Sequence, residues 1–330
     1  MKILATLATL AALALGTIAP AAHAQPSGTI TLYTSHPDNQ LTQLLAEFAK
    51  AQPAIKVRVF RSGTTEVMNK LQAEQMAGSV QADVVMLADD ISLTRLKRAG
   101  MLLPYPDAPT QHLPAALVDP QKTFFGTRLI TTGLIYNTKL VPTPPKSWTD
   151  LLAPGVAAKT IMPSPLYSGA ALMNVGVLAQ QPKLGWKYLS TLAHDGAVAT
   201  SGNGSVIEAV ASGEKAYGIG IDYMAFNAKA KGSPVNFVFP TEGVTIISQP
   251  VAILKASKNV EAAKAFVNWL LSDAGQNNAV EQGYYPAATN IKPPHGYPAL
   301  GSLVIMKPDL EKLIDADAAN KEKFSDLFGQ

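Results

Sequence analysis

The amino-acid sequence predicts an α/β protein made of two lobes, and three observations support this prediction. Segments with the pattern of buried strands alternate with segments of helical periodicity along most of the chain, as in parallel sheets covered by helices. The length of 330 residues suits two domains of about 150 residues each. Two longer extended runs, Thr127–Asn137 and Gly243–Leu254, stand where a chain would leave one lobe and later return to it.

The first α/β unit occupies the N-terminal third of the chain. β-Branched residues bounded by turn formers predict its strands, and apolar residues three and four positions apart predict its helices. The predicted order is strand Gly28–Tyr33, helix Leu41–Lys50, strand Ile55–Phe60, helix Val67–Met76, strand Ala82–Leu87 and helix Ile91–Ala99. Because strands and helices alternate, we expect a parallel sheet with helices on both faces.

The second α/β unit begins near Thr160, and a largely helical segment follows it. The same patterns predict strands Thr160–Met162, Ala197–Ala199, Ala216–Ile221 and Val235–Phe239 and helices Ala170–Gln180, Trp186–Ala193, Val206–Ala211 and Tyr223–Lys231. Helices are then predicted at Val260–Leu271, Ala274–Glu281 and, in two short pieces, within Leu303–Leu327. The two crossings place residues 25–127 and 247–330 in lobe 1 and residues 128–246 in lobe 2, with a ligand cleft between the lobes.

Residues 1–24 have the pattern of a secretory signal peptide. Lys2 precedes the apolar stretch Ile3–Ile18, and Ala22-His23-Ala24 is a small-residue cleavage site, so cleavage is expected after Ala24. A membrane anchor is the alternative. It is disfavoured because the apolar stretch is short and Pro20 follows it.

The composition argues against several classes of function. The chain has no cysteine, which excludes disulfides, thiolate metal sites and cysteine nucleophiles. Charged residues make up only 15% of the chain and form no basic cluster, so nucleic acid is not an expected partner. The histidines lack the paired spacing of a zinc site, and no G-x-S-x-G elbow or Walker sequence is present. Neither a cofactor nor a metal is expected.

Four short polar tracts bear most directly on ligand chemistry. They are Tyr33–His36, Arg61–Glu66, Tyr167–Ala170 and Ser201–Ser205, each at a predicted change from strand to helix. A helix start offers unpaired N–H groups and a partial positive charge, so several of them aimed at one point would bind an anion. Each tract is also an ordinary helix cap, and Gly63 and Glu66 have the spacing of a capping box.

Nearly all of the chain after the leader resembles a known protein family. The segments YTSHPD, RVFRSGTTEV, QADVVMLADD, GTRLITTGLIYNTKLVP, YSGAA and QPVAILKASKNVEAAKAFVNWLLSDAGQ are similar to those of periplasmic solute-binding proteins of ABC importers. The resemblance is to the branch that contains ferric-ion, hexose-phosphate and 2-aminoethylphosphonate binders. It implies a two-lobed periplasmic binding protein fold of the type II kind, with two crossing strands as the hinge. The implied partners are a small-molecule ligand and a membrane permease, the implied location is the periplasm, and a monomer is expected.

Within this branch, the resemblance argues against ferric iron as the ligand. The ferric-binding members' histidine, carboxylate and tyrosine-pair positions fall on Pro37, Ala88 and Tyr223-Met224, so only one phenol is retained. A ferric ion requires several anionic oxygen donors. The adjacent Tyr284-Tyr285 pair is interpreted as packing. The helix start that holds a phosphate in ferric-binding members is intact at Ser168-Gly169-Ala170, which implies a ligand that carries its own phosphoryl group.

A small phosphonate or phosphate ester, with 2-aminoethylphosphonate as the best candidate, is therefore the predicted ligand. Residues predicted to bind its anionic group are Thr34, Ser35, Ser62, Gly63, Thr64, Ser168, Gly169, Ala170, Asn203, Ser205 and Tyr223. Arg61 could neutralise a dianion, although such an arginine is more often a surface charge. Residues predicted to bind the ammonium end are Asp222, Glu242 and Asp89, of which Asp222 and Asp89 could instead cap helices.

Two alternatives to this prediction remain open at this point. One is a ferric-ion-binding protein that uses Tyr223, His36 and Asp89. The other is a secreted hydrolase with the same two lobes, which would need a nucleophile with its base or a metal cluster. The sequence shows neither of these, so an enzyme is not expected.

Overall fold

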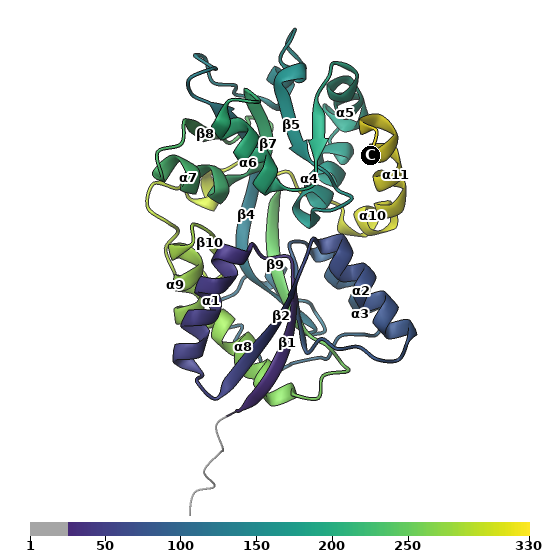
Figure 1. Ribbon diagram of the computed structural model, residues 1–330, viewed down its shortest axis with the longest axis vertical. Coiled ribbons are helices and arrows are strands. Elements are labelled where there is room, and N and C mark those ends of the chain that lie inside the picture. The colour runs from purple at the N-terminus through teal and green to yellow at the C-terminus, as the bar shows by residue number, and fades with distance from the viewer. Residues whose placement is uncertain (1–25) are drawn as a thin grey trace, which may run out of the picture.

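The computed structural model describes residues 26–330 and has two α/β lobes stacked along its long axis (Figure 1). The predicted signal peptide lies outside the described residues. Strands β4 (Phe124–Asn137) and β9 (Ile246–Ile253) run between the lobes. No helix within residues 26–330 is both long enough and apolar enough to cross a membrane.

Lobe 1 contains a sheet in the order β2-β1-β3-β9-β4. Its strands β1 (Gly28–Thr34), β2 (Ile55–Arg61) and β3 (Val84–Met86) pair in parallel, as expected from the alternation of strands and helices. The helices of this lobe are α1 (Asp38–Ala51), α2 (Thr64–Met76), α3 (Asp90–Arg98), α8 (Val260–Leu271) and α9 (Asp273–Glu281). Phe48 of α1 packs edge-on against Phe266 of α8 with 4.9 Å between ring centroids, which fixes these helices on one face of the sheet.

Lobe 2 repeats this arrangement with its own parallel strands. Strands β5 (Thr160–Pro163), β6 (Val198–Thr200) and β7 (Tyr217–Ile221) pair in parallel, and β8 (Val235–Val238) pairs with β4. The helices are α4 (Gly169–Gln180), α5 (Gly185–His194), α6 (Asn203–Ser212) and α7 (Asp222–Ala230). Helix α4 is buried on nearly all sides, which explains why its sequence is apolar throughout rather than on one face.

The two predicted crossings are confirmed. Strand β4 pairs antiparallel with β9 from Phe124 opposite Ala252 to Thr131 opposite Ile246, and it continues into lobe 2, where it pairs with β7. The register shifts between Gly126 and Leu129, so the ladder is irregular near its middle. Among the described residues, β4 is the strand that pairs with strands of both lobes, with β9 and β10 in lobe 1 and with β7 and β8 in lobe 2.

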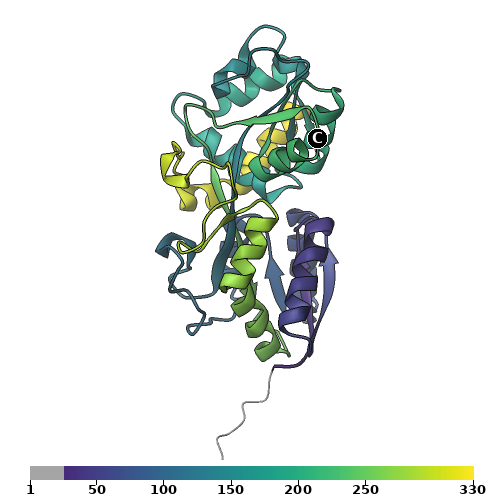
Figure 2. The same cartoon turned by 90° about the vertical axis from the view of Figure 1, so that its left-hand side faces the viewer.

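The C-terminal helices are not confined to the lobe predicted for them. After α8 and α9 the chain pairs with β4 at β10 (Tyr285–Pro286) and then leaves lobe 1. Helix α11 (Asp317–Phe328) packs against α4 and α5 of lobe 2, whereas α10 (Leu310–Asp315) lies against both α4 of lobe 2 and α3 of lobe 1 (Figure 2). Phe324 and Leu313 are buried in the same core cluster as Trp148. The expectation that residues 247–330 all belong to lobe 1 is therefore wrong for α11, whose apolar side chains pack on helices of lobe 2. Helix α10 bridges the two lobes, and Arg95 and Arg98 of α3 form ion pairs with Asp317 and Asp315 of these helices.

Candidate functional site

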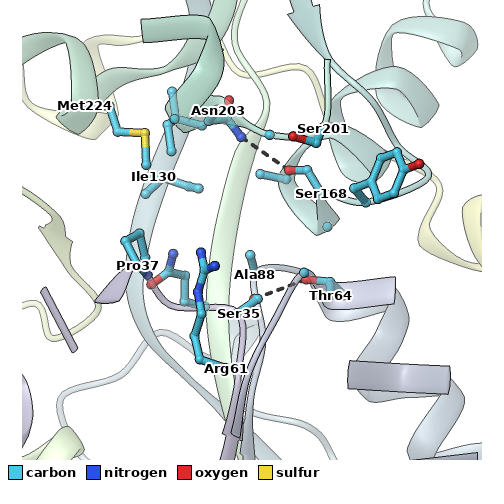
Figure 3. Close-up of a pocket in the computed structure, with 18 of the residues that line it drawn as sticks. Ser35, Pro37, Arg61, Thr64, Ala88, Ile130, Ser168, Ser201, Asn203 and Met224 are labelled. Atoms are coloured by element: carbon cyan, nitrogen blue, oxygen red, sulfur yellow. Dashed lines mark hydrogen bonds between the residues drawn. The ribbon is translucent and has the colours of Figure 1, made fainter. Parts of the chain in front are cut away.

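A cavity of about 250 Å³ lies between the two lobes, and all four polar tracts contribute to its wall (Figure 3). Lobe 1 contributes Ser35, Pro37, Arg61, Gly63, Thr64, Glu66 and Ala88, and lobe 2 contributes Tyr167 to Ala170, Ser201 to Gly204, Ile221, Tyr223 and Met224. Ile130 of β4 and Gln249 of β9 complete the wall from the crossing strands. The tracts thus meet in space, as the predicted strand ends require.

Five helices begin at this cavity. The residues that precede α1, α2, α4, α6 and α7 are Pro37, Gly63, Ser168, Gly202 and Ile221, and each lines the cavity. The first turn of a helix has unpaired N–H groups and carries a partial positive charge of about half an elementary charge. Several such starts around one cavity make an environment suited to an anion.

The hydroxyl groups of lobe 1 gather on one side of the cavity. Ser35 follows β1, Thr64 opens α2, and the Thr64 hydroxyl donates to Ser35 Oγ at 3.1 Å. Arg61 ends β2 and extends into the cavity (Figure 3). Its Nε donates to the His36 carbonyl at 3.3 Å, and its nearest carboxylate, that of Asp38, is 3.9 Å away. The Arg61 charge is therefore held in place without a close ion pair.

The polar groups of lobe 2 face them. Ser168 is the N-cap of α4 and its Oγ accepts from the Ala171 N–H at 3.2 Å. Asn203 Nδ2 donates to the same oxygen at 3.3 Å, which joins the starts of α4 and α6 (Figure 3). Asn203 Oδ1 is buried without a hydrogen-bond partner. A buried unpaired acceptor costs about 1–3 kcal/mol, so its position beside a cavity indicates a place for a donor.

Two glycines allow the lobes to touch beside the cavity. A Cβ at Gly169 would lie 2.8 Å from Thr64 Oγ1 and closer still to an Asp89 carboxylate oxygen, both of lobe 1. A Cβ at Gly63 would lie 2.9 Å from the Tyr167 carbonyl oxygen of lobe 2. Neither glycine has a positive φ, so close approach rather than backbone conformation is what requires glycine here.

Three residues predicted to bind the anion lie outside the cavity wall. Thr34 is fully buried and donates to the Met86 carbonyl at 2.8 Å, which ties β1 to β3. Ser62 and Ser205 belong to contributing tracts but do not line the cavity. The predicted residues that do line it are Ser35, Gly63, Thr64, Ser168, Gly169, Ala170, Asn203 and Tyr223.

The three carboxylates predicted to bind an ammonium group also lie outside the cavity wall. Asp222 is 1% exposed, and its oxygens accept from Thr131 N and Oγ1 at 3.0 and 2.7 Å and from Tyr223 N at 2.7 Å. Burial raises the pKa of Asp222 to about 7. Asp222 therefore joins β4 to α7, and the expectation that it faces the cleft is wrong.

Asp89 and Glu242 are likewise committed to local structure. Asp89 caps α3 by accepting from Ser92 N at 2.6 Å and Ser92 Oγ at 3.0 Å, and burial raises its pKa. Glu242 accepts from the Ser147 hydroxyl and from Trp148 N at 3.2 Å. Both side chains satisfy N–H groups at helix starts, which the sequence had left open as an alternative for Asp89.

The carboxylate that does line the cavity is Glu66, whose spacing from Gly63 in the sequence is that of a capping box. It is the third residue of α2, the capping-box position, but no side-chain cap hydrogen bond forms there. Its Oε2 is buried without a partner and lies against Gly63. Other lining residues outside the predicted set include Tyr167, Ser201, Ile130 and Gln249. Tyr167 and Ser201 lie within two of the four polar tracts, so their place in a tract was the sequence feature that could have identified them.

The positions at which the resemblance described above implies metal ligands face the same cavity with different chemistry. Pro37, Ala88 and Met224 all line it, and none of them offers an oxygen donor (Figure 3). His36, the alternative metal ligand, is 3% exposed, and its ring stacks on Tyr284 at 5.7 Å. Within residues 26–330 no three His, Cys, Asp or Glu side chains are grouped so that they could hold a metal ion.

Comparison with known proteins agrees with this architecture. The profile of the family described as bacterial extracellular solute-binding protein matches residues 34–277. A probable ABC transporter periplasmic-binding protein of Sinorhizobium fredii is 28% identical over 73% of this chain and 69% of its own length. The fold is also that of the periplasmic binding protein AfuA from Actinobacillus pleuropneumoniae, solved with fructose-6-phosphate bound (TM-score 0.84, 23% identity, 92% of this chain and 99% of that one).

Iron-bound HitA from Pseudomonas aeruginosa has the same fold, with a TM-score of 0.80, 22% identity and coverage of 90% of this chain and 99% of that one. The family match covers most of the described residues, including both crossing strands and all five helix starts at the cavity. The chain therefore belongs to the bacterial extracellular solute-binding protein family.

Proposed function

We propose that this protein captures a small phosphonate or phosphate ester in the periplasm and delivers it to the permease of an ABC importer. As a member of a solute-binding family, it binds its ligand without chemical change and is not an enzyme. The observation that carries the ligand class is the meeting of five helix starts, several hydroxyl groups and Arg61 at one cavity. Donors of this kind match the oxygens of a phosphoryl group.

The proposed mode of action is closure of the lobes around the ligand. One lobe takes up the ligand, and the other then rotates about β4 and β9 until both sets of donors reach it. Ser35 and Thr64 of lobe 1 lie opposite Ser168 and Asn203 of lobe 2, so a bound anion would join the lobes (Figure 3). A ligand that contacts both lobes stabilises the closed state in proportion to those added contacts.

Within this class, 2-aminoethylphosphonate remains our preferred ligand. The cavity of about 250 Å³ suits a small molecule, and its wall carries both a cation, Arg61, and a carboxylate, Glu66. A zwitterion requires this combination, with donors for the phosphonate and a carboxylate for the ammonium group. The support from the named relatives is broader, since AfuA was solved with a sugar phosphate bound.

A thermal-shift screen tests the ligand class. We expect 2-aminoethylphosphonate to raise the Tm of the protein, because a ligand at about 100 times its Kd stabilises the folded state by about 2.7 kcal/mol. Inorganic phosphate is expected to raise the Tm less, because it lacks the ammonium group. Ser168→Ala is expected to reduce each shift, measured from the variant's own ligand-free Tm, since it removes the hydroxyl between α4 and α6. The absence of a shift with 2-aminoethylphosphonate, phosphate and hexose phosphates alike would contradict the proposal.

A visible absorption spectrum, together with the Tm in ferric citrate, decides between this proposal and iron binding, the alternative suggested by the likeness to iron-bound HitA. Ferric iron bound by the phenolate of Tyr223 would produce a visible charge-transfer band. Only one tyrosine of the tyrosine-pair positions is present, beside Met224, so no such band is expected. Appearance of the colour together with a raised Tm in ferric citrate would favour iron.

Substitution of Glu66 tests the position of the ammonium group. We expect Glu66→Gln to weaken 2-aminoethylphosphonate by about 10- to 100-fold, the value of one charge-assisted hydrogen bond, and to change phosphate binding little. Asp222→Asn is the matched control, because Asp222 is buried outside the cavity wall. Isothermal titration calorimetry provides the affinities. Equal losses for both ligands in Glu66→Gln would show that Glu66 does not contact the ammonium group.

A further inference from the structure

Arg128 is a buried cation for which the architecture gives no ion-pair partner. It lies on the crossing strand β4, is 1% exposed, and ranks among the largest fully buried side chains. Its one side-chain hydrogen bond runs from Nη1 to Gln282 Oε1 at 3.0 Å, and its Nε has no partner. The titratable groups coupled to it are the phenols of Tyr284 and Tyr223 and the ring of His36, and none of the salt bridges within residues 26–330 includes it.

The surroundings of Arg128 contain further unpaired polar atoms. The two ring nitrogens of His36 and Oε1 of Gln249 are buried and make no hydrogen bond of good geometry, although the His36 ring lies beside the Gln249 and Gln282 side chains. Burial and the nearby Arg128 charge hold the pKa of His36 well below its usual range, so this ring is neutral. Buried polar groups in folded proteins are almost always paired, which makes such a group of exceptions informative.

This group of residues reaches the ligand cavity through two aromatic rings. The guanidinium carbon of Arg128 lies 5.0 Å from the centre of the Tyr284 ring, and that ring lies 4.2 Å from the ring of Tyr223. Tyr223 lines the cavity, as does Gln249. Arg128 is therefore close to the cavity wall and separated from it by side chains that transmit its field at low dielectric.

A buried charge without a partner destabilises the folded state. Removing a charge from water costs several times what one neutral hydrogen bond returns, and hydrophobic residues of similar volume at such positions often leave a protein equally or more stable. Residues that break a packing rule without a local compensation are expected at functional sites. We therefore expect the buried charge of Arg128 to be balanced by a negative charge on a bound ligand.

We propose that Arg128 is the resident countercharge for the anionic group of the ligand and acts through the Tyr284–Tyr223 ring pair and the Gln249 side chain. The inference rests on the proposed function, because it assumes an anion in the cavity. Arg128 is a positioning residue here: its charge makes the Tyr223 hydroxyl a better donor and lowers the energy of an anion at the wall. Arg61 supplies a second, solvent-accessible charge with a side chain that is 40% exposed.

Three variants test this inference, with inorganic phosphate and 2-aminoethylphosphonate as probes. Arg128→Met removes the charge and keeps an unbranched apolar stem, Arg128→Lys keeps the charge, and Arg61→Gln removes the exposed charge. We expect Arg128→Met to lower the affinity for both anions about tenfold at both low salt and about 1 M salt, since a buried charge is screened little. Arg128→Lys should restore most of the affinity, and the loss in Arg61→Gln should shrink at high salt.

The ligand-free Tm separates this role from a structural one. Arg128→Met is expected to melt at or above the temperature of the wild type, because it relieves an unpaired buried charge. Unchanged affinity in Arg128→Met, or a fall of both Tm and affinity that Lys does not restore, overturns the inference and leaves the proposed function intact. A wild type that binds neither anion overturns both.

Discussion

Gly169→Ala is expected to bind the phosphorylated ligand of the wild type about 10- to 100-fold more weakly. The added methyl group would lie 2.8 Å from Thr64 Oγ1 and closer still to Asp89, so the lobes could not approach to the distance seen in the structure. Overpacking of this kind costs about 1–3 kcal/mol, and each 1.4 kcal/mol is a factor of ten in affinity. The cost falls on the closed state, because an open state separates Gly169 from both groups.

Isothermal titration calorimetry gives the affinity, and small-angle X-ray scattering with saturating ligand reports whether the lobes still close. Gly204→Ala is the matched control, since Gly204 lies on the same wall and nothing would lie within 4 Å of its Cβ. The control should close as the wild type does. Full closure and unchanged affinity in Gly169→Ala would show that the contact between Gly169 and lobe 1 does not limit closure.

Phe324→Ala is expected to lower the free energy of unfolding by about 3–5 kcal/mol, the usual cost of removing a buried phenylalanine side chain. Phe324 is 0% exposed and belongs to the same core cluster as Trp148 and Leu313. It also stacks on Phe328 with 4.4 Å between ring centroids. The loss of this side chain leaves a cavity between α11 and the helices of lobe 2.

Urea unfolding followed by circular dichroism measures this effect. Asp326→Ala is the control on the same helix, because Asp326 is exposed, and it should stay within about 0.5 kcal/mol of the wild type. A loss of less than about 1 kcal/mol in Phe324→Ala would mean that the C-terminal helices contribute little to lobe 2.

The order of strands and helices could be predicted from the sequence, because local patterns determine it. Alternation at Ile55–Phe60 and helical spacing at Leu41–Lys50 both describe how a segment meets its nearest neighbours. The lobe that receives a helix is a different matter. Leu313 and Phe324 mark apolar sides of α10 and α11, but such a side fits any uncovered core, and only the assembled structure selects lobe 2.

The candidate site divides along the same line. Strand ends located the cavity, since the carboxyl ends of parallel strands meet at one edge. The direction of each side chain was not predictable, as Asp222 illustrates: it follows β7 at the cavity, yet its carboxylate turns inward to Thr131. Glu66 shows the opposite outcome. Its spacing from Gly63 indicated a helix-capping role, but its carboxylate lines the cavity.

Because α11 lies on lobe 2, the distance between the two described ends of the chain can report on the relative position of the lobes. The described chain begins with β1 in lobe 1 and ends with α11 on lobe 2, so its two described ends lie on different lobes (Figure 1). Fluorescent proteins fused before Gly28 and after Gln330 would therefore change their energy transfer when the lobes rotate. If both ends lay on lobe 1, rotation of the lobes would not change the energy transfer. The fold thus lends itself to a reagentless optical sensor for whichever solute closes it.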